Sequence, residues 1–196
     1  MSEKSIRVKR LVLLAMFTAI AAALITLVHF PLFPAAPYLQ YDPADVPILI
    51  AAFAFGPAAG LIVTVLASFI QAFFLGGDGI YGFLMHVVAT GILVIVASTI
   101  YRRFHTRPGA VVGLVLGTLA MGLGMMVANH FITPVYSGMP TEAVDALLLP
   151  VILPFNLLKA GINSAITFLV YKVVSKYIIH GELHTKNAAR KAGSEI

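Results

Sequence analysis

The stretch VPILIAAFAFGPAAGLIVTVLASFIQAFFL, residues 46–75, decides how this chain folds. It carries no charged residue, and it is too long for one straight span because about 20 apolar residues cross a bilayer. Gly56-Pro57 interrupts it, and proline breaks a helix because it lacks an N–H donor and clashes with the preceding turn. The stretch therefore predicts a short helix over 46–55 and a longer helix over 57–75.

The composition of the whole chain indicates the same environment. Hydrophobic residues make up 60% of the 196 residues and charged residues only 11%, whereas soluble domains have about 25% charged residues. We therefore expect an integral membrane protein. The chain has no cysteine, which excludes disulfides and Cys-based metal sites.

The remaining apolar runs complete a predicted all-α membrane domain of six transmembrane helices over residues 1–196. The last run begins in a turn that Pro150 and Pro154 disturb. The further spans are expected at about 11–30, 80–101, 110–133 and 147–177.

In this six-span arrangement, the basic residues and the acidic loop residues lie in different connections. Basic residues precede the first span, lie between the fourth and fifth spans and follow the sixth, while the acidic residues of the loops fall in the other connections. Basic segments stay cytoplasmic, so both termini are predicted to be cytoplasmic and the net charge of +5 to reflect topology and contact with lipid headgroups. Nucleic-acid binding would need a soluble basic face, and we expect none.

Sequence motifs for catalysis are missing. The segment GPAAGLIV lacks the lysine and hydroxyl of a phosphate-binding loop, and no H-E-x-x-H motif occurs. We therefore expect neither an enzyme, nor a metal site, nor a resident cofactor.

A polar set interrupts the sixth apolar run. Asn156, Lys159 and Asn163 share one helix face at positions i, i+3 and i+7, and Asn129 and His130 lie near the outer end of the fifth span. A lysine at this depth costs about 2.5–3.5 kcal/mol on insertion scales unless a partner or water meets it. We expect Asn129, Asn156 and Lys159 to face an outward cavity that hydrates the lysine until a polar ligand fills it. The alternative is interhelical hydrogen bonding, which we favour for Asn163; His130 could serve either purpose.

Three other features have a functional and a plain structural interpretation. The first span carries Ala15, Ala19 and Ala23, a small-residue row that would let a partner helix approach closely, or would serve internal packing. The proline-rich connection PLFPAAPYLQYDPADVP could cover an outward pocket, with Tyr41 as a substrate-binding residue, or simply connect two spans. His86 could be a core residue or part of a pocket wall.

The sequence also resembles a known family. The run YLQYDPADVPILIAAFAFGPAAGLIV, the Asn129–Pro134–Tyr136 pattern and PFNLLKAGINS are similar to S components of energy-coupling factor (ECF) vitamin transporters, above all the riboflavin-specific subfamily. The likeness extends over most of residues 10–178.

This resemblance implies a prokaryotic cell-membrane subunit that binds riboflavin from outside and joins a T component and two cytoplasmic ATPases, which would supply the missing ATP hydrolysis. It implies that Asn129, Asn156 and Lys159 hydrogen-bond the flavin ring, and that the alanine row docks on the T component. Amides offer donors and acceptors to the ring edge. Apolar walls would come from further residues, namely Leu39, Phe83 and Phe131.

The chain departs from the riboflavin pattern at two places. It has Ala67-Ser68 where the subfamily carries Lys-Asn, and Gly82-Phe83 and His86 where the subfamily carries Gly-Glu and Asn. Another vitamin or heterocyclic precursor is therefore the alternative ligand, and a non-transport scaffold or assembly subunit is the alternative outside the class.

Overall fold

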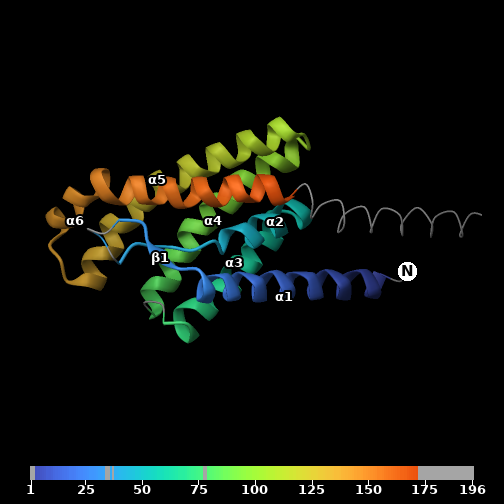
Figure 1. The fold of residues 1–196 in the computed structure, drawn as a ribbon, viewed down its shortest axis with the longest axis horizontal. Helices are drawn as coiled ribbons and strands as arrows, with labels where there is room; N and C mark the ends of the chain where they lie inside the picture. Colours follow the sequence, from blue (N-terminus) through green and yellow to red (C-terminus); the bar gives the residue numbers. More distant parts are fainter. Residues whose placement is uncertain (1–2, 34–35, 37, 77–78, 172–196) are drawn as a thin grey trace, which may run out of the picture.

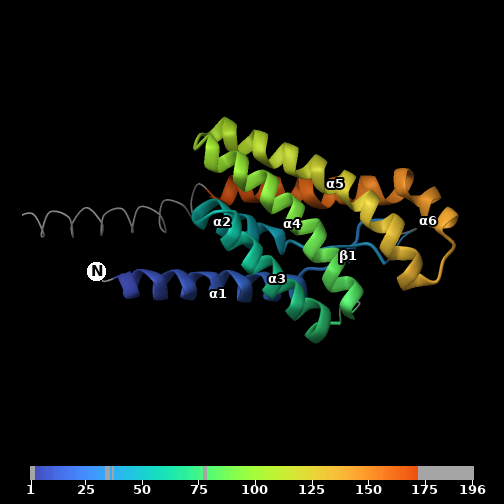
Figure 2. The same ribbon diagram turned by 180° about the vertical axis from the view of Figure 1, so that it is seen from behind.

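The computed structural model describes residues 3–33, 36, 38–76 and 79–171. These residues form a bundle of long helices (Figures 1 and 2). The helices are α1 (Glu3–Leu27), α2 (Asp45–Phe55), α3 (Pro57–Phe74), α4 (Gly79–Arg103), α5 (Arg107–Ser137) and α6 (Thr141–Leu147), and a π-helical turn (Leu148–Ile152) joins α6 to a last helix over 153–171.

The helix lengths confirm the all-α membrane fold. Within the described residues, five helical segments are long and apolar enough to cross a membrane, and α2 is a shorter apolar helix. The last of the five, Thr141–Tyr171, combines α6, the π-helical turn and the last helix. Residues 172–177 of the expected sixth span lie outside the described residues.

Helix α2 lies at the centre of the bundle, packed against α1, α3 and α4. Its 11 residues span about 16 Å, roughly half of the hydrocarbon core. Gly56 ends α2 with a φ of 94°, a left-handed conformation that favours glycine, and Pro57 opens α3 at a position where no N–H is needed. The break predicted at Gly56-Pro57 is therefore present.

Glycines let the helices approach closely. A Cβ atom at Gly60 would lie 2.5 Å from the Cβ atom of Ala52, across the α2–α3 turn. In the α4–α5 hairpin, a Cβ atom at Gly113 would lie 2.6 Å from the carbonyl oxygen of Ala97. Both pairs illustrate the packing of small residues that holds helices together in lipid.

The sixth span differs from a regular helix at its start. The Leu153 N–H donates to the Leu148 carbonyl, five residues earlier, and Pro150 lies inside this wider turn. Proline would clash with the carbonyl of a normal α-helical turn, and a π-helical turn is one way to absorb that conflict. Pro150 therefore reshapes the helix without ending it.

The connection between α1 and α2 contains a short β-ribbon. Strand β1 (Phe30–Pro31) pairs antiparallel with β2 (Gln40–Tyr41), with Phe30 opposite Tyr41. Helix α1 ends at Leu27, before this ribbon, whereas the first span was predicted to end at residue 30. The ribbon brings the second half of the connection back over the bundle, where Tyr41, Asp42 and Asp45 become buried.

The charges divide the bundle into two ends. We call one end of the bundle the basic end. It contains the start of α1, the α2–α3 turn, the α4–α5 turn and the end of the last helix (Figures 1 and 2). Arg102 and Arg103 lie there in the last turn of α4, and Arg107 begins α5. The opposite end, with α6 and its Glu142, is called the acidic end. This separation agrees with the charge pattern predicted from the sequence.

Candidate functional site

A buried ion pair joins the last helix to the connection. The Lys159 ammonium donates to Asp42 Oδ2 at 2.6 Å, and both side chains are almost fully buried. The expectation that Lys159 needs an open, hydrated cavity is wrong in this structure, because a carboxylate of the connection neutralises it. Two opposite charges that are also hydrogen-bonded reduce the cost of burying each charge alone.

Asn163, one turn further along the same helix face, links the connection to the last helix. Its amide nitrogen donates to the Asp42 backbone carbonyl at 3.0 Å and to Asp45 Oδ2 at 2.9 Å. Its amide oxygen accepts the Tyr41 hydroxyl at 2.9 Å. Asn163 is fully buried and thus makes the interhelical hydrogen bonds that the sequence suggested for it.

The phenol of Tyr41 is a donor in this network. Burial raises the pKa of Tyr41, and the nearby carboxylates of Asp42 and Asp45 raise it further. The hydroxyl therefore stays protonated over the ordinary pH range and keeps its hydrogen bond to Asn163.

A second branch of the network extends from Asp45 to α3 and α4. Thr90 donates to Asp45 Oδ1 at 2.6 Å, and His86 Nε2 lies 3.8 Å from the same oxygen. His86 Nδ1 is hydrogen-bonded to the Ser68 hydroxyl at 3.1 Å. His86 is thus part of the polar network; its buried Nε2 has no hydrogen-bond partner among the described residues.

Asn129 and Asn156 are buried but bond mainly within their own helices. The Asn129 amide donates to the Met125 carbonyl at 2.7 Å, and the Asn156 amide donates to the Ile152 carbonyl at 2.8 Å. Such bonds to the carbonyl four residues earlier add little to helix stability. A ligand that offers better partners could therefore recruit both amides.

The structure does not gather all the predicted wall residues. Phe83 packs with Phe69 and Phe73 in an aromatic cluster of α3 and α4, with ring centroids 6.3–6.4 Å apart. Phe131 is 67% exposed and lies edge-on to His130. Leu39 is half-buried in the connection. The described contacts do not join Phe83 or Phe131 to the buried polar network.

His130 forms a separate contact near the acidic end. Its Nδ1 lies 2.6 Å from Asp145 Oδ1, with both side chains about 40% exposed (38% and 42%). This bond joins α5 to α6 at the surface and lies apart from the buried network.

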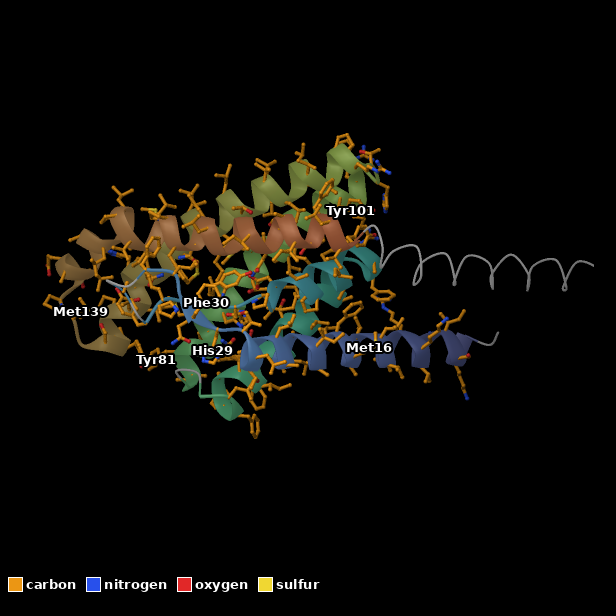
Figure 3. All side chains as sticks on the ribbon, in the orientation of Figure 1. Met16, His29, Phe30, Tyr81, Tyr101 and Met139 are labelled. Atoms are coloured by element: carbon orange, nitrogen blue, oxygen red, sulfur yellow. The ribbon has the colours of Figure 1, made fainter. Side chains whose placement is uncertain are left out.

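The predicted docking row lies on an uncovered face of α1. Ala15, Ala19 and Ala23 are all exposed, and Met16 between them is 43% exposed; Figure 3 labels Met16 on α1. Four-residue spacing puts the three alanines on one side of the helix. Nothing in the described chain covers this side, so it is available to a partner.

Asp42, Asp45 and Thr90 were not predicted as site residues. From the sequence alone, we interpret the two aspartates as charged loop residues that indicate the topology. The signal that could have found them is Lys159, because a lysine buried at that depth needs a partner and a carboxylate neutralises its charge, and the chain has only 8 acidic residues.

These features define the class: a multi-pass membrane protein with a buried polar site between its α1–α2 connection, its central helices and its last helix. The family model described as "ECF transporter, substrate-specific component" matches residues 9–171. The chain therefore belongs to the family of ECF substrate-specific components.

Two curated relatives are similar over nearly their whole length. The riboflavin transporter RibU of Staphylococcus aureus (strain TCH60) is 30% identical over 176 residues, covering 87% of this chain and 92% of the relative. The riboflavin transporter FmnP of Bacillus subtilis (strain 168) is 30% identical over 182 residues, covering 88% and 95%. Among solved structures, one described as "Structure and mechanism of the S component of a bacterial ECF transporter" matches with a TM-score of 0.78 at 30% identity, covering 88% of this chain and 98% of that one.

Proposed function

We propose that this chain is the riboflavin-binding S component of an ECF importer. The observation that carries the proposal is a set of three buried polar side chains, Asn129, Asn156 and Lys159, in a protein similar along its length to two riboflavin transporters. Riboflavin is the transported ligand and not a resident cofactor.

The hydrogen bonds of these side chains support a role in binding. Among the described residues, the two amides bond only to groups of their own helical segments, so a flavin ring edge could take over their donors and acceptors without breaking contacts between helices. Lys159 has three donors, of which Asp42 occupies one. The remaining donors could meet a flavin carbonyl or a ribityl hydroxyl.

The buried network gives the connection a role in the same site. Asp42, Asp45 and Tyr41 hold the connection against the last helix through Lys159 and Asn163. A ligand that bonds Lys159 therefore acts on the same side chain that anchors the connection. We infer that riboflavin binding and the position of the connection are energetically coupled.

The partners follow from the same proposal. The chain would deliver its ligand by docking the exposed row of Ala15, Ala19 and Ala23 on a T component, and two ATPases on the cytoplasmic side would supply the energy. Both termini would then lie in the cytoplasm.

The experiment is identification of the bound molecule. Protein purified from cells grown with riboflavin should absorb in the visible range, and mass spectrometry of the released ligand should give riboflavin in amounts close to one per chain. Folded protein that binds no flavin at micromolar riboflavin would contradict the proposal.

One observation favours a different heterocycle as the second candidate. Ser68 and His86, which replace residues of the riboflavin pattern, are hydrogen-bonded to each other at 3.1 Å. The two departures therefore form one unit, which could alter one wall of the pocket. A competition titration with riboflavin, a second flavin and thiamine would separate these candidates.

A further inference from the structure

We propose that a cavity at the basic end of the bundle binds the phosphate group of an organic phosphate. The cavity is partly open, has a volume of about 430 Å³ and is bordered by the end of α2, the first turn of α3, the end of α4 and Arg10 of α1. Small-molecule sites typically measure about 300–1,000 Å³. The cavity lies at the end of α2, whereas Asp45 of the polar network lies at the start of that helix, so the proposal is independent of riboflavin binding.

Basic side chains line this cavity. Among the described residues, its lining includes two arginines, Arg10 and Arg102, and the imidazole of His105, but no aspartate or glutamate. The carboxylates that form ion pairs in the described residues are Asp42, Asp45 and Asp145, and their partners are other side chains. An anion from outside the described chain is therefore the group that would complete this site.

Arg10 is held in place at the cavity edge. Its Nη2 donates to the Phe55 carbonyl at 3.0 Å, and its guanidinium carbon lies 5.9 Å from the Phe55 ring centroid. A guanidinium has five N–H donors, so this anchoring leaves most of them available. The Arg102 side chain makes neither an ion pair nor a hydrogen bond with the described residues.

An aromatic stack forms one wall of the cavity. Phe53 stacks on Tyr101 with ring centroids 4.6 Å apart, and the ring centroids of Tyr101 and His105 lie 5.4 Å apart. Figure 3 shows Tyr101 at the basic end of the bundle. This wall fixes His105 and gives the organic part of the ligand an apolar surface.

Phosphate fits these donors better than a simple carboxylate does. Guanidinium groups bind phosphate oxygens through two parallel hydrogen bonds, and a tetrahedral anion can accept from Arg10, Arg102 and His105 on different sides. The first turn of α3, which lines the same cavity, adds the positive end of its helix dipole. The ligand could be an anionic phospholipid headgroup or a soluble phosphate ester, because both present this group.

The chain offers a matched control in the neighbouring arginine. Arg102 and Arg103 are adjacent, exposed and equally charged, but only Arg102 lines the cavity. A general attraction between basic residues and lipid would depend on both arginines alike. Phosphate binding at a specific site in the cavity would depend on Arg102 far more than on Arg103.

The test uses the purified full-length protein in a neutral detergent and compares two probes. One arm titrates phosphatidylglycerol in mixed micelles and follows retained lipid by native mass spectrometry; the other titrates glycerol 3-phosphate by calorimetry. We expect saturable binding in one arm, weakened about tenfold by Arg102→Gln and by less than about threefold by Arg103→Gln. His105→Gln provides a second exposed variant of the lining.

The source of the phosphate follows from which arm saturates. Saturation by phosphatidylglycerol alone identifies a lipid site, and saturation by glycerol 3-phosphate identifies a site for soluble esters. Saturation in neither arm, or an equal loss with Arg102→Gln and Arg103→Gln, would overturn the proposal.

Discussion

Replacing Lys159 with methionine tests the buried network most sharply. Methionine keeps most of the stem and removes the ammonium that donates to Asp42 at 2.6 Å. Asp42 is 3% exposed, so its carboxylate would be left buried without a cation. Breaking a buried pair by removing one partner typically costs about 3–5 kcal/mol. We therefore expect the ligand-free Lys159→Met protein to be destabilised by about this amount.

The assay is thermal unfolding of the ligand-free protein in detergent. In soluble domains of this length, about 1 kcal/mol shifts the melting temperature by about 2–4 °C, so the expected loss is about 6–20 °C. Lys9→Met is the matched control, because Lys9 is exposed on α1 and its replacement should change the melting temperature by no more than about 2 °C.

A double substitution separates loss of the pair from loss of the lysine. Adding Asp42→Asn to Lys159→Met removes the unpaired carboxylate and should recover much of the stability. The reasoning would be refuted if Lys159→Met melted like the wild type, or if the double variant were as unstable as the sum of the two single variants.

Three further perturbations test other parts of the structure. In this Cys-free chain, Met139→Cys should react with an impermeant thiol reagent on intact cells and His105→Cys should not; the reverse labelling would invert the topology. Ala19→Leu should leave ligand binding intact but abolish most uptake, and normal uptake would place the docking face elsewhere. Gly60→Ala should destabilise the protein by about 1–3 kcal/mol in thermal unfolding, because its Cβ would meet Ala52 at 2.5 Å; an unchanged melting temperature would show that the turn relaxes.

The helical fold could be predicted because its signals are local. A charge-free run, a Gly-Pro break and charges between spans each act within a few residues, and Gly56-Pro57 indeed separates α2 from α3. The β-ribbon left no such signal, because strands of two residues carry no periodicity. The π-helical turn at Pro150 could not be predicted either, since a proline predicts that a helix is disturbed but not which form the disturbance takes.

The site could be predicted only in part. Asn156, Lys159 and Asn163 stand out because polar residues in an apolar helix require partners. Their partners Asp42 and Asp45 could not be assigned, because the fold of a proline-rich connection over the bundle depends on contacts between residues more than 100 positions apart. The sequence also could not decide whether the Phe131 ring faces lipid or protein, and the structure leaves this side chain 67% exposed.

The most direct test of the proposed function is riboflavin titration of the purified wild type and of Asn156→Leu, followed by quenching of flavin fluorescence. Among the described residues, the Asn156 side chain bonds only to the Ile152 carbonyl in the preceding turn of the same helical segment, so the variant should fold normally. The account predicts saturable binding by the wild type at one riboflavin per chain. It predicts a dissociation constant about 5- to 140-fold higher for Asn156→Leu, which corresponds to about 1–3 kcal/mol. No saturation by a folded wild type, or equal affinities of the two proteins, would contradict it.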